Sequence, residues 1–405
     1  MSKLSKDAKE RIIISLTSDP VGKEVIKAIE DSGILTGNTS PADSLGDNGN
    51  LYMNLINGDL FKKFNDHWVL QANGVGNGVE AAFEDIEQPV GLKTPSLVTL
   101  AINDSNRTLT VDRVEDSFIC FVKGKRIEIT STLEAIWPDT HGLHFFYIDE
   151  NGDLITTTSF TESIITEYTF VSILYWDATV KKHIYWGDER HSIKMSPQTH
   201  VYLHRTRGTA FDRGCKLVNF VADGGGSLAT HAQFSANSGV IWDEDIEISV
   251  SSQTQFPVLY RQGVTNWKRK EANSFPIIMS GEEGYVGAGG LIAYNNFDGT
   301  NWSLAQVDNN KFMLIHVFAT NDIDFPFMCV LGQAMYNDKT SARAVSATEI
   351  KTISGLPFAE FCPVGSIVFQ TSSSYTNTPK AQIVSVNGNS YEDHRGESLR
   401  PGSLA

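Results

Sequence analysis

Cysteine is scarce in this sequence of 405 residues, and the four that occur are isolated from one another as Cys120, Cys215, Cys329 and Cys362. Since none forms a CxxC pair, neither a cysteine zinc site nor a dithiol redox motif is supported. We expect four reduced thiols that pack as small apolar side chains. Long apolar runs are missing too, because no stretch of 18 apolar residues occurs, so we predict no transmembrane helix.

A surplus of positive charge is also missing. The chain has 33 Lys and Arg against 48 Asp and Glu, a formal net charge of −15. This balance argues against a nucleic-acid-binding surface as the main function. The opening "MSKLSKDAKERIIISL" has no long apolar stretch before a small-residue cleavage site, so we predict no secretion signal. We expect neither nucleic acid nor membrane insertion.

Motifs that would identify an enzyme are absent. There is no HExxH, HxH or GxSxG, and the glycine-rich "ADGGGS" that begins at Ala222 lacks the GK[ST] ending of a phosphate-binding loop. We therefore predict no catalytic residue, no metal ligand and no cofactor. The abundant aromatic residues are interpreted as β-sheet core rather than as a sugar-stacking surface.

Two acidic stretches are weaker candidates for chemistry. The carboxylates of "WDEDIEI", residues 242–248, could bind calcium or hydrolyse a glycosidic bond. Because Ile246 and Ile248 alternate with Asp245 and Glu247, we interpret the stretch as a half-exposed strand. The stretch "GDERH", residues 187–191, follows the aromatic "HIYW" and is interpreted as a polar turn.

Two histidine pairs suggest a metal at first sight. His141 and His144 are three residues apart, and His200 and His204 are four apart. We interpret "QTHVYLHRTRG", which contains the second pair, as strand and turn. On a strand these two side chains would lie roughly 13 Å apart, at about 3.3 Å per residue, so chelation is not expected.

The remaining pattern predicts a mainly β protein. Runs such as "RTLTVDR", "SFICFVKG" and "KFMLIHVFAT" are rich in β-branched and aromatic residues and are separated by Asn, Asp and Gly. Helical spacing is confined to two short N-terminal stretches, the second beginning at Asp19-Pro20, and to "SATEIKTISGL" late in the chain. We predict a helical segment at 1–36, a linker and β-hairpin module at 37–74, and β-sandwich-like domains at 75–235 and 236–405.

The module depends on the stretch "LYMNLINGDLFKKFNDHWVLQAN", residues 51–73. Asn57-Gly58 predicts a two-residue type I′ turn, which places Leu55 opposite Leu60 and Leu51 opposite Phe64. Asn65-Asp66 predicts a second tight turn before a strand that contains Trp68. One face then collects Leu51, Met53, Leu55, Leu60 and Phe64. A sheet of only two or three short strands is marginally stable in water by itself. This apolar face therefore needs a partner surface.

The stretch "DNGNLYMNLINGDLFKKFNDHWVLQAN" resembles a short module that recurs in tailed-bacteriophage fibre and baseplate proteins. There the pattern is Gly-Asp-Leu-Tyr, a turn, Gly-Asp-Val-Tyr-Lys-Lys and a Trp-containing strand. This chain departs from it mildly, with Asn50 in place of Asp and Phe61 in place of Tyr. Residues 140–381, including "LYWDATVKKHIYWGDERH", "THVYLHRTRGTAFDRG" and "GVIWDEDI", resemble the same loose class of virion proteins.

This resemblance implies a homotrimer in which hairpins from three chains, with Trp68, pack about the axis. It implies a structural virion protein, a tail fibre, spike or baseplate component, made in the bacterial cytoplasm and contributing to host attachment. Its partners would be other tail proteins, docked through the N-terminal segment, and a glycan or protein of the host surface through residues that the sequence does not identify.

Two other functions are open. Some phage spikes degrade glycans, and the suspects here would be Asp188, Glu189, Asp243, Glu244 and Asp245. The long regular repeats of a β-helix, the usual scaffold of such enzymes, are missing. A cellular lectin-like module is the third possibility, and the missing secretion signal counts against it.

Overall fold

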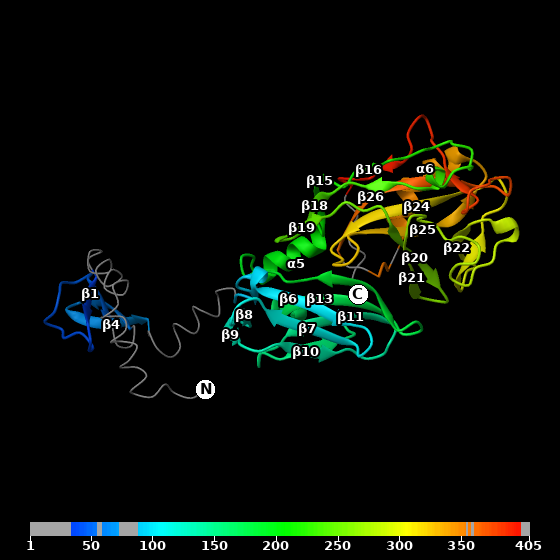
Figure 1. The fold of residues 1–405 in the computed structure, drawn as a ribbon. Helices are drawn as coiled ribbons and strands as arrows, with labels where there is room; N and C mark the ends of the chain where they lie inside the picture. Colours follow the sequence, from blue (N-terminus) through cyan, green and yellow to red (C-terminus); the bar gives the residue numbers. More distant parts are fainter. Residues whose placement is uncertain (1–33, 55–58, 73–87, 354, 358–359, 398–405) are drawn as a thin grey trace. The chain divides into compact units, whose positions relative to one another are not determined.

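The computed structural model describes residues 34–54, 59–72, 88–353, 355–357 and 360–397. The chain divides into two compact units, Met1–Glu87 and Gln88–Ala405, here called unit 1 and unit 2. Both are built mainly from strands (Figure 1), so the predicted mainly β fold is confirmed. The two predicted N-terminal helices fall within 1–33, outside the described residues, and Leu35 and Thr36 belong to a strand rather than to a helix.

Unit 1 contains one four-stranded sheet with the order β1-β2-β3-β4. Its strands are β1 Leu35–Gly37, β2 Leu51–Asn54, β3 Leu60–Phe64 and β4 His67–Ala72. The predicted turn between β3 and β4 is confirmed, because Asn65 and Asp66 have φ of 51° and 64° and Phe64 pairs with His67. Asn and Asp tolerate this left-handed conformation better than most residues.

The register of the first hairpin differs from the prediction. Leu51 lies opposite Lys62 rather than Phe64, and Met53 lies opposite Leu60. The amide of Asn54 donates to the carbonyl of Asp59 at 2.9 Å, so four residues, not two, connect the strands. Leu55, Asn57 and Gly58 fall within this connection, outside the described residues. The observed register is shifted by two.

Aromatic pairing explains the shift. In the observed register Tyr52 lies opposite Phe61, with ring centroids 6.3 Å apart, whereas the predicted one would place Lys63 there. Because the shift is two residues, each side chain still points to the predicted face of the sheet.

One face of the unit 1 sheet is partly covered by residues 38–50, although Leu70 on this face is 43% exposed. Tyr52 is 3% exposed and donates through its hydroxyl to the carbonyl of Thr39 at 2.9 Å. The Lys63 ammonium donates to the carbonyls of Asp43, Leu45 and Gly46. Trp68 lies on this covered face and donates to the carbonyl of Ala42 at 3.0 Å. Trp68 therefore packs within its own chain, on the side opposite the predicted apolar face.

The other face carries Leu51, Met53, Leu60, Phe64 and Val69. Their shared face follows from the pairing of Leu51 with Lys62, Met53 with Leu60 and Lys62 with Val69, and from strand alternation. Phe64 is 65% exposed and Val69 is 46% exposed.

The N-terminal part of unit 2 comprises three antiparallel sheets, with the orders β12-β11-β13-β14, β10-β7-β6 and β5-β8-β9. The strands are β5 Gly91–Leu92, β6 Val98–Asn103, β7 Thr108–Arg113, β8 Phe118–Val122, β9 Lys125–Ile129, β10 Leu133–Ile136, β11 Gly142–Ile148, β12 Leu154–Thr157, β13 Thr169–Asp177 and β14 Lys182–Asp188. β13 is buried along its whole length, because Val171 and Trp176 enter one core cluster and Ile173 and Tyr175 enter another.

The C-terminal part of unit 2 is organised around a seven-stranded sheet, β21-β20-β25-β24-β26-β27, with β28 also paired to β26. Its strands are β20 Phe256–Gln262, β21 Asn266–Asn273, β24 Phe312–Thr320, β25 Phe327–Tyr336, β26 Phe361–Thr371, β27 Ala381–Ile383 and β28 Glu392–Asp393. Smaller sheets are formed by β15 Ala210–Gly214, β18 Gly239–Asp243 and β19 Ile246–Val250, by β16 Leu217–Val218 and β17 Ser235–Ala236, and by β22 Ala293–Phe297 and β23 Trp302–Gln306.

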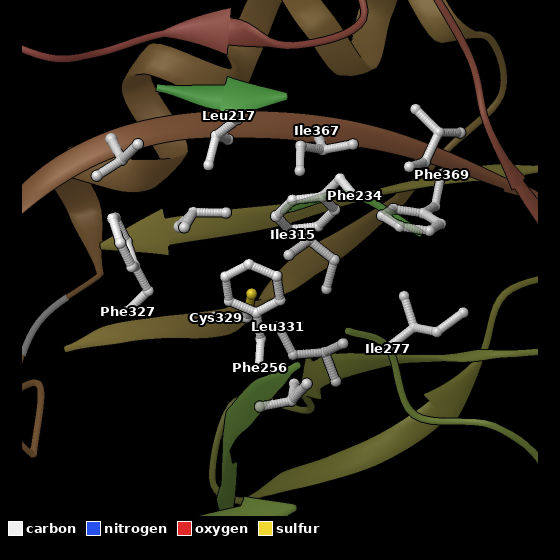
Figure 2. Close-up of a cluster of buried hydrophobic side chains, with 14 of the residues drawn as sticks. Leu217, Phe234, Phe256, Ile277, Ile315, Phe327, Cys329, Leu331, Ile367 and Phe369 are labelled. Carbon is white, nitrogen blue, oxygen red and sulfur yellow. The ribbon is translucent and has the colours of Figure 1, made fainter. Parts of the chain in front are cut away.

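The largest core cluster of unit 2 lies against the seven-stranded sheet. Figure 2 shows Phe256, Ile315, Phe327 and Phe369 packed together, with Cys329 among them. All four cysteines are buried and free. A second cluster contains side chains from both parts, including Tyr185 of β14 and Phe318 of β24. The boundary predicted between residues 235 and 236 falls inside unit 2, where β15 pairs with β18.

The described helices are short. They are α4 Ser163–Thr166, α5 Pro197–Thr206 and α6 Lys339–Thr352, with 3₁₀ turns η1 Pro95–Leu97, η2 Ala229–Ala232 and η3 Ala288–Gly290. The late helix is confirmed as α6, although it begins earlier than predicted. None of the helices that the structure describes is long and apolar enough to cross a membrane.

Residues 197–206 form helix α5, so the predicted strand and turn at this position is wrong. Ser196 caps the helix by accepting a hydrogen bond from the amide of Thr199 at 3.2 Å, and Pro197 occupies the first turn. A Ser-Pro pair in these positions is a recognised helix start, and it is the local signal that the prediction overlooked.

Candidate functional site

Four segments of unit 2 bring histidines and carboxylates together in a buried cluster, here called the His/carboxylate cluster. Its members are Glu189 and His191 after β14, His200 and His204 on α5, Asp243, Glu244 and Asp245 at the β18–β19 turn, and Glu360 just before β26. Figure 1 shows α5 beside the hairpin of β18 and β19. The two acidic stretches and the second histidine pair of the sequence therefore meet at one place.

The β18–β19 turn directs its carboxylates inward. Asp243 pairs with Ile246, so Glu244 and Asp245 form the two-residue turn. Glu244 has φ of 44°, a left-handed conformation that is strained for Glu and often marks a functional position. The side chains of Asp243 and Glu244 are 0% and 1% exposed. The predicted solvated strand face is thus wrong for both, whereas Glu247 is exposed as predicted.

Asp245 orients the ring of His191. Its Oδ1 lies 2.7 Å from Nδ1 of His191, and its Oδ2 accepts hydrogen bonds from the amide and hydroxyl of Ser192. With Nδ1 held, Nε2 of His191 points into the cluster, 3.6 Å from Oε2 of Glu189 and 3.9 Å from Oδ2 of Asp243. A carboxylate behind an imidazole in this way fixes the direction of the other ring nitrogen.

Glu244 lies between the two histidines of α5. Its Oε2 is 3.9 Å from Nε2 of His200, and its Oε1 is 3.7 Å from Nδ1 of His204. Residues four apart on a helix share a face, so α5 presents both rings to the cluster. The same Nδ1 of His204 lies 3.3 Å from Oε1 of Glu360, and the rings of His191 and His200 have centroids 4.2 Å apart.

In two of the carboxylates, a residue outside the cluster donates a hydrogen bond to one oxygen, and the second oxygen faces the cluster. Glu189 accepts from the side-chain amide of Asn321 at 3.1 Å, and Glu360 accepts from the hydroxyl of Thr209 at 2.6 Å. In the described part of the chain no group forms a hydrogen bond of good geometry with either oxygen of Asp243, either oxygen of Glu244 or Oε1 of Glu360. Buried carboxylate oxygens without a donor are rare and costly.

The electrostatics are correspondingly perturbed. Burial raises the pKa of Asp243 well above its ordinary value, and burial also raises the pKa of Glu360. Burial lowers the pKa of His200 to about 3. Burial opposes the charge of His191 and of His204, but Asp245 raises the pKa of His191 to about 10 and Glu244 raises that of His204 to about 9. Five carboxylates thus face three imidazoles in a buried space, and their charges are strongly coupled.

A surface hollow of about 390 Å³ borders the cluster and is lined by Leu203, Arg207, Phe211, Trp242 and Glu244 among others. Glycan hydrolysis requires two carboxylates that flank a bound sugar in a cleft. With Glu189, Asp243 and Glu244 all buried, a small ion fits the site better than a polysaccharide does.

A second polar network resembles a catalytic triad but is sealed. The hydroxyl of Ser366 lies 2.8 Å from Nδ1 of His316 and 2.9 Å from Nε2 of His394, and Nε2 of His316 lies 3.3 Å from Glu349. Ser366, His316 and His394 are each 0% exposed. A nucleophile in this position cannot reach a substrate, so we interpret the network as a structural one.

The histidines of the other pair, at which no chelation was expected, have separate partners. His144 points to the carbonyl of Thr140 and His141 lies 3.4 Å from Asp177. From the sequence, His200 and His204 were considered but rejected because they were placed on a strand, and Glu360 was missed. The helix start was a usable signal for the two histidines, whereas nothing local marks Glu360.

Searches against protein-family models, curated proteins and solved structures found no match. The function is therefore inferred from residues and geometry.

Proposed function

We propose that this chain is a structural protein of a tailed-bacteriophage virion, a trimeric tail fibre, spike or baseplate component that contributes to host-cell attachment. The support comes from the resemblance of residues 47–73 and 140–381 to such proteins, together with one observation on unit 1. That observation is the exposed apolar face formed by Leu51, Met53, Leu60, Phe64 and Val69.

Exposure of this face is unusual for so small a sheet. Its opposite face is partly covered by residues 38–50, with Leu70 left 43% exposed there, whereas Phe64 is 65% exposed and Val69 46% exposed. Complete burial of one such side chain contributes about 1.5–3 kcal/mol, so covering both would stabilise each chain by on the order of 2 kcal/mol. Threefold packing of identical faces provides this cover without disulfides or a second kind of protein.

The remaining parts have roles consistent with this assembly. The N-terminal segment would dock onto another tail protein, and the β-rich unit 2 would form the exposed body. The protein would be made in the bacterial cytoplasm and then incorporated into the virion. Glycan degradation is less well supported, because the suspected carboxylates Glu189, Asp243 and Glu244 are buried.

The test is the native mass of the purified full-length protein, measured by light scattering on a sizing column. We expect three times the chain mass of 44.6 kDa. The double variant Phe64→Ser, Val69→Ser should shift the protein toward monomer. The matched control is Val264→Ser, Val286→Ser, at unit 2 positions that are 65% and 83% exposed. The proposal would be overturned if the wild-type protein were a monomer. It would also be overturned if the double variant and the control formed trimers that dissociate equally on dilution.

A further inference from the structure

We propose that the His/carboxylate cluster of unit 2 is a buried centre for divalent transition-metal ions, with two ion positions that share Glu244. The first position is surrounded by His191, His200 and Glu244, with Glu189 and Asp243 beside His191, and the second by His204, Glu244 and Glu360. This inference does not depend on the proposed virion function.

The spacing of the donor atoms is the first argument. Apart from the 2.7 Å contact of Asp245 with His191, the five histidine–carboxylate contacts in the cluster measure 3.3 to 3.9 Å. Four of the five are longer than a good N–H···O hydrogen bond of about 2.7–3.2 Å by 0.4 Å or more. Two ligands each about 2.0–2.2 Å from one tetrahedral ion lie roughly 3.4 Å apart. The separations therefore suit atoms that share an ion better than atoms that share a proton.

The unpaired oxygens are the second argument. Both oxygens of Asp243 and of Glu244, and one of Glu360, are buried without a hydrogen bond of good geometry in the described chain. A cluster held together by protonated histidines would satisfy these oxygens with short charged hydrogen bonds. Here the two oxygens of Glu244 instead face different histidines, His200 and His204, as the oxygens of a bridging carboxylate do.

The supporting residues are the third argument. Asp245 fixes the ring of His191, Asn321 holds Glu189 and Thr209 holds Glu360. Metal-binding imidazoles and carboxylates are typically held by such outer partners. Mixed imidazole and carboxylate donors favour ions such as zinc, cobalt, manganese or iron over calcium and magnesium, which prefer oxygen alone.

The burial indicates a structural role for the ions. The ligands come from the loop after β14, from α5, from the β18–β19 turn and from the residue before β26, so bound ions would join segments from both parts of unit 2. A surface hollow is lined in part by Glu244, the residue that the two ion positions share. Ion binding to such preassembled ligands adds directly to the free energy of unfolding.

The test uses the full-length protein. Metal is removed with a chelator, and Co²⁺ and Zn²⁺ are then titrated separately, with Co²⁺ followed by its visible absorption and Zn²⁺ by elemental analysis after dialysis. We expect two ions per chain and a higher melting temperature with Zn²⁺ but not with Mg²⁺ at equal concentration. No uptake by folded wild-type protein would overturn the proposal, and one ion per chain would overturn the bridged pair.

Glu244→Gln is the discriminating variant. Glu247→Gln is the matched control, because Glu247 is exposed and lies in the same hairpin. The melting temperature of Glu244→Gln without metal is measured beside that of the wild type, so that ion binding is compared between folded proteins. We expect Glu244→Gln to lose Zn²⁺ stabilisation and to bind at least about 100-fold more weakly, whereas Glu247→Gln binds like the wild type. Asp245→Asn, a positioning change, should weaken binding about 10–100-fold. Glu244→Gln with unchanged ion affinity would refute the assignment.

Discussion

Lys268 and Asp177 form a buried ion pair whose disruption should destabilise unit 2 strongly. The ammonium of Lys268, on β21, lies 2.8 and 2.7 Å from the two carboxylate oxygens of Asp177, at the end of β13. The Asp177 side chain is 0% exposed and that of Lys268 is 11% exposed. Burial raises the pKa of Asp177, but hydrogen bonds from His141 and Lys268 outweigh it and lower the pKa below its ordinary value.

Lys268→Met keeps the aliphatic stem and removes the charge, so the carboxylate stays buried with fewer donors. The amide of Thr179 still donates to Asp177 at 2.8 Å, which softens the loss. Breaking a buried pair by removing one partner costs about 3–5 kcal/mol, and we expect the lower end of this range. Six of the seven tryptophans lie in unit 2, so urea unfolding followed by tryptophan fluorescence reports this change.

Lys182→Met is the matched control. Lys182 lies 3.3 Å from Glu271, and the two side chains are 56% and 57% exposed. A surface pair of this kind contributes less than about 1 kcal/mol. The double change Asp177→Asn, Lys268→Met should recover part of the stability lost in Lys268→Met. If Lys268→Met and Lys182→Met lowered the free energy of unfolding equally, the reasoning from burial would be refuted.

Two further predictions concern a titration and a turn. Burial lowers the pKa of His183, but Asp104 and Asp324 raise it to about 9, so its stabilising effect is complete below pH 6.5 and is lost as the pH rises toward 9. The stability difference between wild type and His183→Gln should therefore shrink by on the order of 3 kcal/mol from pH 6 to pH 9 in urea unfolding, and a pH-independent difference would contradict this. Asn65→Val, at φ of 51°, should destabilise unit 1 by roughly 1–2 kcal/mol and speed amide exchange in residues 60–72. Asn65→Gly is the control, and its amides should exchange at the wild-type rate. Equal amide exchange rates in the wild type, Asn65→Val and Asn65→Gly would argue against a strained turn.

Some features could be predicted because single residues encode them. Asn65-Asp66 turns the chain through φ values that these side chains tolerate. The alternation of β-branched and polar residues indicated strands, and strands are what most of these runs form. The sequence also predicted correctly that Leu51, Met53 and Phe64 point to one face of the sheet. The error in the register did not change this, because it was an even number of residues.

Other features could not be predicted locally. The register of the first hairpin was decided by the contact between Tyr52 and Phe61, which a rule based on the turn alone does not weigh. Helix α5 had a start signal in Ser196-Pro197, but its β-branched and aromatic residues suggested a strand.

The sequence by itself determined a mainly β chain, its tight turns and an apolar face on the small N-terminal sheet, because these depend on backbone preferences and on strand periodicity. Only the tertiary structure decided that the acidic stretches at 187–191 and 242–248 and the histidines of α5 are one cluster. Their members come from segments up to 171 residues apart, between Glu189 and Glu360. Whether a carboxylate is solvated or buried beside an imidazole depends on what packs over it, and no periodicity in the chain records that.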